Sequence, residues 1–146
     1  MTPAAGQRSG NVLGFDFGEK RIGVAVGQPL TGTATPLESL RNRNGRVDWP
    51  AVEALVGNWR PVALVVGNPL NMDGTRQRVT DLADAFAREL EKRFGLPVHR
   101  CDERLSTYEA RDRTKRQRDV DAVAAQVILE SWLAGQGQAA TADGNE

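Results

Sequence analysis

The stretch Asn11–Gly27, NVLGFDFGEKRIGVAVG, decides how the fold begins. Residues 11–17 and 21–27 are both rich in the β-branched and large apolar residues that favour strands. The three residues GEK at 18–20 separate the two segments, so we expect an antiparallel hairpin. The chain is therefore predicted to open with two paired strands.

Further strands are predicted after the hairpin. Residues 31–36 are a candidate third strand, and the apolar run VALVV at 62–66 suits a strand buried on both faces. The segment PVHRC at 97–101 is a short additional strand. These strands lie between segments of helical character.

Helices are predicted over about 50–59 and 76–94, from 106 onward, and from 119 to 134. Their candidate N-terminal caps include Asp48, Asp119 and Ser106, the last in a capping box with Glu109. A hairpin followed by alternating helices and strands predicts an α/β fold with a mixed sheet and helices packed on it.

Length and composition fit one cytoplasmic domain. The 146 residues carry 19 Lys+Arg and 19 Asp+Glu, and this zero formal net charge disfavours a polybasic binder. One Cys and one His exclude a disulfide framework and a multi-Cys or His-pair metal site. No segment has the apolar character of a membrane span or a secretory signal. We expect a flexible tail at 1–10, a single domain at 11–134 and a disordered tail at 135–146.

Three carboxylates stand at positions that suggest a shared site. Asp16 interrupts an apolar strand, where a carboxylate is costly unless it is paired, either with Lys20 or Arg21 or with a ligand. Glu103 follows the strand at 97–101 by two residues, and a solvated loop position is the alternative for it. Asp121 heads an apolar helical stripe, although a favourable place in the first helical turn also explains an Asp there.

These three carboxylates can converge at one point in a mixed sheet. Clustered carboxylates repel unless cations compensate their charge. Oxygen-only ligand sets suit Mg²⁺ or Mn²⁺, and two such ions can drive phosphodiester hydrolysis. The sequence therefore predicts a metal-binding catalytic centre at Asp16, Glu103 and Asp121.

Basic residues and a polar loop are candidate phosphate contacts. The loop GNPLNMDGT at 67–75 connects a strand to a helix, where backbone amides can hold phosphate, although an ordinary turn also explains it. A second basic cluster, with a weaker claim, is Arg41, Arg43 and Arg46 in a Gly/Asn-rich loop. The main basic stretch lies beside the acidic positions, and a solvated face is its alternative; it consists of Arg111, Arg113, Lys115, Arg116 and Arg118.

Four motifs together resemble a known family. They are GFDFGEKRIGVAVG at 14–27, VVGNPLNMDGT at 65–75, DERLST at 102–107 and DAVAAQVILESWL at 121–133. Their order along residues 11–134 is similar to that of the YqgF family. These are bacterial RuvC-like proteins of the RNase H-like superfamily, described as pre-16S rRNA nucleases and earlier as Holliday junction resolvases. Asn68 departs from the G-L-P found in many relatives, and the 108–121 segment looks shorter.

The resemblance implies a fold and a set of roles. The fold would be RNase H-like, with strands one to three antiparallel, then parallel strands, and helices on both faces. Asp16, Glu103 and Asp121 match the family's acidic metal-binding positions. The residues that match its substrate-side positions are Lys20, Arg21, Asn71, Asp73 and Thr75. Arg104 of the DERLST motif is a further candidate substrate contact.

The leading hypothesis is a metal-dependent endonuclease that processes the 5′ end of precursor 16S ribosomal RNA, in contact with RNA and with ribosomal particles. A Holliday junction resolvase acting on branched DNA is one alternative, and symmetric cutting would require a dimer. A non-catalytic nucleic-acid-binding or ribosome-associated module is another. We expect a monomer or a weak dimer.

Overall fold

The computed structural model of the chain describes residues 10–43, 46–68, 78–102 and 117–144. Its elements, in chain order, are β1 (Val12–Phe17), β2 (Arg21–Gln28), β3 (Thr33–Arg43), β4 (Arg46–Val47), α2 (Trp49–Trp59), β5 (Ala63–Asn68), α3 (Arg78–Phe94), β6 (Val98–Asp102) and α5 (Gln117–Gly144). The predicted helix that starts at Ser106 lies outside the described residues.

The strands form one mixed sheet in the order β4-β3-β2-β1-β5-β6. The pairs β1–β2, β2–β3 and β3–β4 are antiparallel, whereas β1–β5 and β5–β6 are parallel. The predicted mixed sheet and its opening hairpin are confirmed. Because β1, β5 and β6 run in the same direction, their carboxyl ends meet at one edge.

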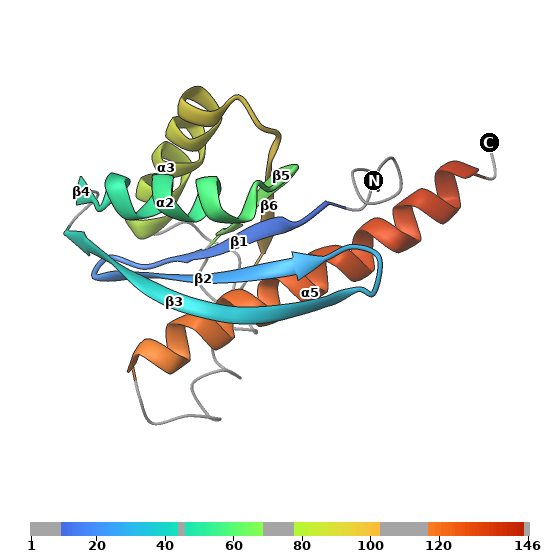
Figure 1. Cartoon of the computed structure of the whole chain (residues 1–146), viewed down its shortest axis with the longest axis horizontal. Helices are drawn as coiled ribbons and strands as arrows, with labels where there is room; N and C mark the ends of the chain where they lie inside the picture. The colour runs from blue at the N-terminus through green and yellow to red at the C-terminus, as the bar shows by residue number, and fades with distance from the viewer. Residues whose placement is uncertain (1–9, 44–45, 69–77, 103–116, 145–146) are drawn as a thin grey trace.

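Helices cover both faces of the sheet, with α2 and α3 on one side and α5 on the other (Figure 1). The alternation of β1 explains this arrangement. Leu13, Phe15 and Phe17 belong to the core against α2 and α3, whereas Val12 belongs to the core against α5. Asp16 therefore shares the α5 face with Val12.

Helix boundaries mostly follow the predicted signals. The side chain of Asp48 accepts a hydrogen bond from the amide of Ala51, which makes it the N-cap of α2. Gly95 follows α3 with a φ of 63°, a left-handed conformation that glycine adopts at low cost.

Three sequence predictions need correction. β3 extends to Arg43 because its pairing with β2 continues past the proline: Ala25 pairs with Pro36 and Val24 with Glu38, so Leu37 is the extra residue of a bulge in β3. Arg41 and Arg43 therefore lie in a strand rather than in a loop. α5 begins at Gln117, so Asp119 lies inside its first turn and is not its cap.

The helix α5 also continues to Gly144, whereas the sequence predicts an end near Ala134. Leu133 is the last of its buried apolar residues among those described, which agrees with the predicted end of the packed part. Gln and Ala favour helix in the segment beyond it.

Candidate active site

Asp16 lies near the carboxyl end of β1 with only 9% of its surface exposed. Its direct partner in the antiparallel ladder is Gly23 of β2. Direct partners in such a ladder present their side chains to the same face of the sheet. The face that Asp16 shares with Gly23 is the one that α5 covers.

Gly23 fixes the position of α5 against this face. A Cβ atom placed at Gly23 would lie 1.8 Å from the backbone oxygen of Asp121 and 2.2 Å from its carbonyl carbon. Such contact requires a residue with no side chain, so the backbone of α5 approaches β2 directly here. Asp121 therefore lies on the same face and at the same level as Asp16.

The sequence of α5 explains its close approach. Ala124, Ala125 and Ile128 are fully buried along one stripe below Asp121, as the helical spacing predicted. The two small alanines let the helix lie close to the sheet, and Asp121 is half-buried at the head of the stripe.

The strand β3 adds a hydroxyl group to the site, at the level of Asp16 and Gly23. Ser39 of β3 is the ladder partner of Gly23, and its hydroxyl donates to Oδ2 of Asp121 at 3.5 Å. Asp16, Gly23 and Ser39 thus form a row across three neighbouring strands, facing the start of α5. Sequence reasoning missed Ser39 and Gly23. A glycine inside the apolar strand RIGVAVG was the available signal for a close approach.

The parallel strands bring β6 to the same edge. Phe15 pairs with Val66, and Val66 pairs with Arg100. One step further, Gly67 pairs with Cys101, so Asp16 lies at the level of Cys101. Glu103 is two residues beyond Cys101 in sequence and lies outside the described residues.

Residues of β6 alternate between the two helical layers. The ring of His99 lies 4.9 Å from that of Trp132 in α5, and the thiol of Cys101 donates to the carbonyl of Ile128 at 3.7 Å. Arg100 forms an ion pair with Asp84 of α3 on the opposite face. Odd positions of β6 therefore face α5, on the side of Asp16.

The donor set of this site consists of oxygen atoms. Within the described ranges, no group of three or more His, Cys, Asp or Glu residues is placed to hold a metal ion. Asp16 and Asp121 place two carboxylates on one side of the sheet, and Ser39 adds a hydroxyl that contacts Asp121. Such oxygen donors suit Mg²⁺ or Mn²⁺, and a third carboxylate would complete the set.

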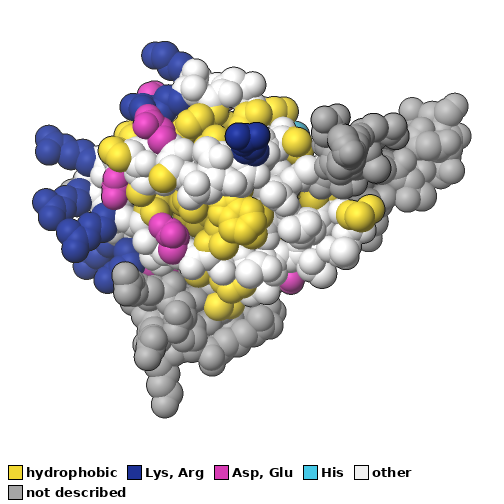
Figure 2. All heavy atoms as spheres, in the orientation of Figure 1, with side chains coloured by type: hydrophobic (Ala, Val, Ile, Leu, Met, Phe, Trp, Pro, Cys, Tyr) yellow, Lys and Arg dark blue, Asp and Glu magenta, His cyan; other side chains and the backbone are white. Residues whose placement is uncertain are grey.

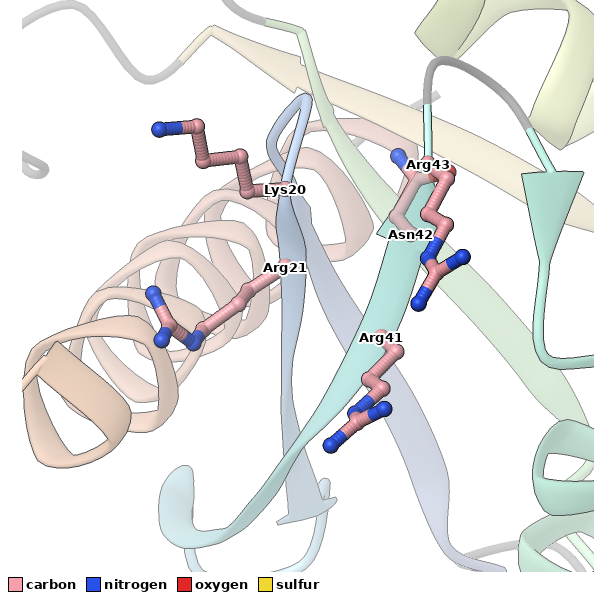
Figure 3. Close-up of a pocket in the computed structure, with 5 residues that line it drawn as sticks. All are labelled: Lys20, Arg21, Arg41, Asn42 and Arg43. Carbon is pink, nitrogen blue, oxygen red and sulfur yellow. The ribbon is translucent and has the colours of Figure 1, made fainter.

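A basic pocket lies at the end of the β2–β3 pair. It is lined by Lys20, Arg21, Arg41, Asn42 and Arg43 and has a volume of about 350 Å³ (Figure 3). Lys and Arg side chains gather at this edge of the molecule, near β4 and the end of β3 (Figure 2). The structure thus brings the predicted pair Lys20 and Arg21 together with Arg41 and Arg43.

Most other predicted substrate contacts lie outside the described residues. Arg118 falls in the first turn of α5. The remaining positions, which the structure does not describe, are Asn71, Asp73, Thr75, Arg104, Arg111, Arg113, Lys115 and Arg116.

Trp49 packs within the protein. Its ring lies 5.5 Å from that of Phe86, and the guanidinium of Arg93 lies 4.2 Å from its centroid. Trp49 thus belongs to the α2–α3 side of the molecule, on the face of the sheet opposite Asp16. None of the helices in the described ranges has the length and apolar character that spanning a bilayer requires.

Solved structures share this fold. The chain is similar to Thermus thermophilus RuvC in complex with a Holliday junction substrate, with a TM-score of 0.57 and 18% identity over 87% of this chain and 95% of that one. It is also similar to the yeast mitochondrial Holliday junction resolvase Ydc2, with a TM-score of 0.53 and 7% identity over 89% and 80% of the two chains. At these identities the likeness shows an RNase H-like fold.

Sequence relatives are much closer. A protein of Azotobacter vinelandii named "Putative pre-16S rRNA nuclease" is 53% identical over 84% of this chain and 92% of its own length. A protein of the same name from Proteus mirabilis is 49% identical over 86% and 96% of the two chains. The sequence profile of RuvX, described as "Holliday junction resolvase", matches residues 10–135. The profile and these relatives cover nearly the whole domain, so the chain belongs to the RuvX (YqgF) family of nucleases.

Proposed function

We propose that this protein is a divalent-metal-dependent endonuclease that cleaves precursor 16S ribosomal RNA. The observation that carries the chemistry is the position of Asp16 and Asp121 on one sheet face, at the edge where β1, β5 and β6 end. The choice of substrate is supported by the names of relatives about half identical to this chain.

Glu103 is the third carboxylate of the proposed centre. Its support is the alternation of β6, in which His99 and Cys101 face α5. The next odd position after the strand is 103. Asp16, Glu103 and Asp121 would together hold the cations.

When bound, the cations supply Lewis-acid activation of water and stabilise the charge that develops on the leaving oxygen. The fold of the chain fixes the positions of the carboxylates that would bind them. Asp16 is fixed by the β1–β2 ladder, and Asp121 is held by the contact of α5 with Gly23 and by the hydroxyl of Ser39. Such rigid placement on strands and a helix favours a precise site.

The substrate backbone would be held by basic residues beside the centre. Lys20 ends the turn between β1 and β2, Arg21 begins β2, and both line the basic pocket. The loop residues Asn71, Asp73 and Thr75, with Arg104 and the basic stretch 111–118, would add further contacts. An rRNA-processing role implies action in the cytoplasm and contact with ribosomal particles, as a monomer or weak dimer.

Cleavage of a Holliday junction is the second candidate, favoured by the description of the RuvX family and by the RuvC-like fold. The chemistry would be the same, but symmetric cutting of a four-way junction requires two active sites in a dimer. The two candidates therefore differ in substrate and in oligomeric state.

A cleavage assay separates these functions. A labelled precursor-rRNA fragment and a four-way DNA junction are incubated with Mg²⁺ or Mn²⁺ and the wild type, Asp16→Asn or Glu91→Gln. Glu91 is an exposed carboxylate of α3, on the opposite face of the sheet, and serves as the control. We expect RNA cleavage by the wild type and Glu91→Gln, and none by Asp16→Asn.

Other results would change the assignment. Cleavage of the junction alone would move the function to DNA recombination. RNA binding without cleavage under any metal condition, equal for all three proteins, would overturn the nuclease and leave a binding module. Full cleavage by Asp16→Asn would refute the proposed centre.

A further inference from the structure

The basic pocket contains more positive charge than the family motifs account for. Lys20 and Arg21 belong to the first motif, but Arg41 and Arg43 come from the end of β3, which no motif covers. All four cationic side chains are exposed. Arg46 of β4, the ladder partner of Arg43, adds a fifth cation at the same edge.

None of these four cations forms an ion pair within the described part of the chain. The ion pairs recorded there involve Arg93 and Arg100, which contact carboxylates of α2 and α3. Several like charges around one pocket repel one another, and this repulsion raises the energy of the empty pocket. An anion with several charges would relieve it.

Asn42 holds the pocket in shape. It is 2% exposed, and its side-chain amide donates to the carbonyl of Gly18 at 2.6 Å. Its backbone amide donates to the carbonyl of Lys20 at 3.0 Å. These bonds tie the β1–β2 turn to β3, so Lys20 and Arg21 stay beside Arg41 and Arg43 without a ligand. A preorganised cluster of cations binds an anion at a lower entropic cost.

The pocket is close to the carboxylates. Arg21 is two residues from Gly23 along β2, which corresponds to about 7 Å. Arg21 and Arg41 are direct ladder partners, so their side chains share one face of the sheet. Figure 3 shows Lys20 and Arg21 on the side toward α5, and Arg41 and Arg43 along the neighbouring strand β3. A chain of phosphates that left the carboxylate pair and crossed the end of the β2–β3 pair would meet these cations in turn.

We infer that this pocket is a second phosphate-binding site, which grips the backbone of the nucleic-acid strand several nucleotides away from the cleaved bond. The inference rests on the proposed function and assigns Arg41 and Arg43 as substrate-binding residues, with Asn42 as their positioning residue. The pocket is lined by four cations and one amide, and by no aromatic ring. We therefore expect it to contact the phosphate backbone without specificity for the base sequence.

The test compares two variants with the same change in net charge. Arg41→Gln/Arg43→Gln removes two pocket cations. Arg88→Gln/Lys92→Gln removes two exposed cations of α3, on the opposite face of the sheet. A third variant, Arg41→Lys/Arg43→Lys, keeps the pocket charge. Circular dichroism and thermal unfolding confirm that each variant is folded.

Binding is measured by fluorescence anisotropy without divalent cations, so that no cleavage occurs. The probes are a labelled single-stranded RNA and a labelled four-way DNA junction, titrated at several salt concentrations. Each phosphate contact contributes about 0.7 to the slope of log K against log salt for a single strand. We expect Arg41→Gln/Arg43→Gln to lower the RNA slope by about 1.4 and to weaken binding about 10- to 25-fold near 0.1 M salt.

The outcomes separate this inference from the function on which it rests. The inference is supported if Arg41→Gln/Arg43→Gln binds RNA more weakly and with a smaller salt dependence than the wild type. Arg88→Gln/Lys92→Gln and Arg41→Lys/Arg43→Lys should keep the affinity and salt dependence of the wild type. Equal binding by both glutamine variants would refute the pocket as a phosphate-binding site. It would not affect the proposed nuclease function. Loss confined to the junction probe would assign the pocket to DNA. If the wild type binds neither probe, the proposed function and the pocket both fail.

Discussion

The contact between Gly23 and α5 is the feature of the fold on which the candidate site depends most, and Gly23→Ala tests it. The added methyl group would lie 1.8 Å from the backbone oxygen of Asp121 and 2.9 Å from the amide nitrogen of Ala122. These are backbone atoms, so rotation of a side chain cannot relieve the clash. The start of α5 must move away from β2.

The size of the effect follows from the distance. Ordinary contact begins near 3.4 Å, so the helix must shift by about 1.6 Å at Asp121. Ile128 and Leu129 are fully buried and resist that shift. Overpacking of this kind costs about 3 kcal/mol in the free energy of unfolding. A displacement of about 1 Å at a reacting group lowers the rate about 100-fold.

Two other glycines provide matched controls. Gly27→Ala would place a methyl group 2.8 Å from Cδ2 of Leu129, a flexible side chain lower on the same helix, and should cost about 1 kcal/mol with little loss of rate. Gly57 of α2 has open space around its Cβ position, and Gly57→Ala should stabilise the protein by about 0.5–1 kcal/mol.

Urea unfolding and cleavage of the precursor-rRNA fragment measure both effects on each variant. The expected order of stability is Gly57→Ala, wild type, Gly27→Ala, Gly23→Ala, with a large loss of rate in Gly23→Ala alone. A Gly23→Ala protein with wild-type stability and rate would refute the close approach of α5 and the shared position of Asp16 and Asp121.

Three further predictions concern stability. Asp16→Asn should abolish the rise in Tm that Mn²⁺ gives the wild type in thermal scans, because a cation that binds the folded state stabilises it and the variant lacks one ligand; an equal rise in both proteins would contradict this role. Asp48→Ala should cost about 1 kcal/mol in urea unfolding through the lost bond to the amide of Ala51, and an unchanged midpoint would argue against this cap. Ile128→Ala should cost about 2–5 kcal/mol, because Ile128 is fully buried between α5 and the sheet, and a cost below 1 kcal/mol would show that α5 packs loosely.

The sequence was sufficient to predict the strands β1, β2, β5 and β6, and to place Asp16 and Asp121 in the strand and the helix where the structure has them. The alternation in NVLGFDF placed Asp16 in a strand, and the helical spacing after Asp121 placed that residue at the head of a buried stripe. Both inferences use the regular periods of strand and helix, which local sequence determines. Their meeting on one face also required the ladder register and Gly23, which only the structure supplies.

The positions of Arg41 and Arg43 could not be predicted from the local sequence pattern. Pro36 cannot donate a ladder hydrogen bond, so the sequence favoured a strand that ended there. A bulge at Leu37, the residue after Pro36 in β3, lets pairing continue to Arg43. A bulge depends on the partner strand, and a local pattern contains no signal for it. The early start of α5 has a simpler cause, because Gln117 and Arg118 favour helix as strongly as the residues after Asp119.

A calorimetric titration of Mn²⁺ tests the central claim most directly, namely that Asp16 helps to hold a divalent cation. Wild type, Asp16→Asn and Glu91→Gln are titrated under the same conditions. We predict equal affinity for wild type and Glu91→Gln, and an affinity at least about tenfold weaker for Asp16→Asn. Equal Mn²⁺ affinity in all three proteins would contradict the assignment of Asp16 as a metal ligand.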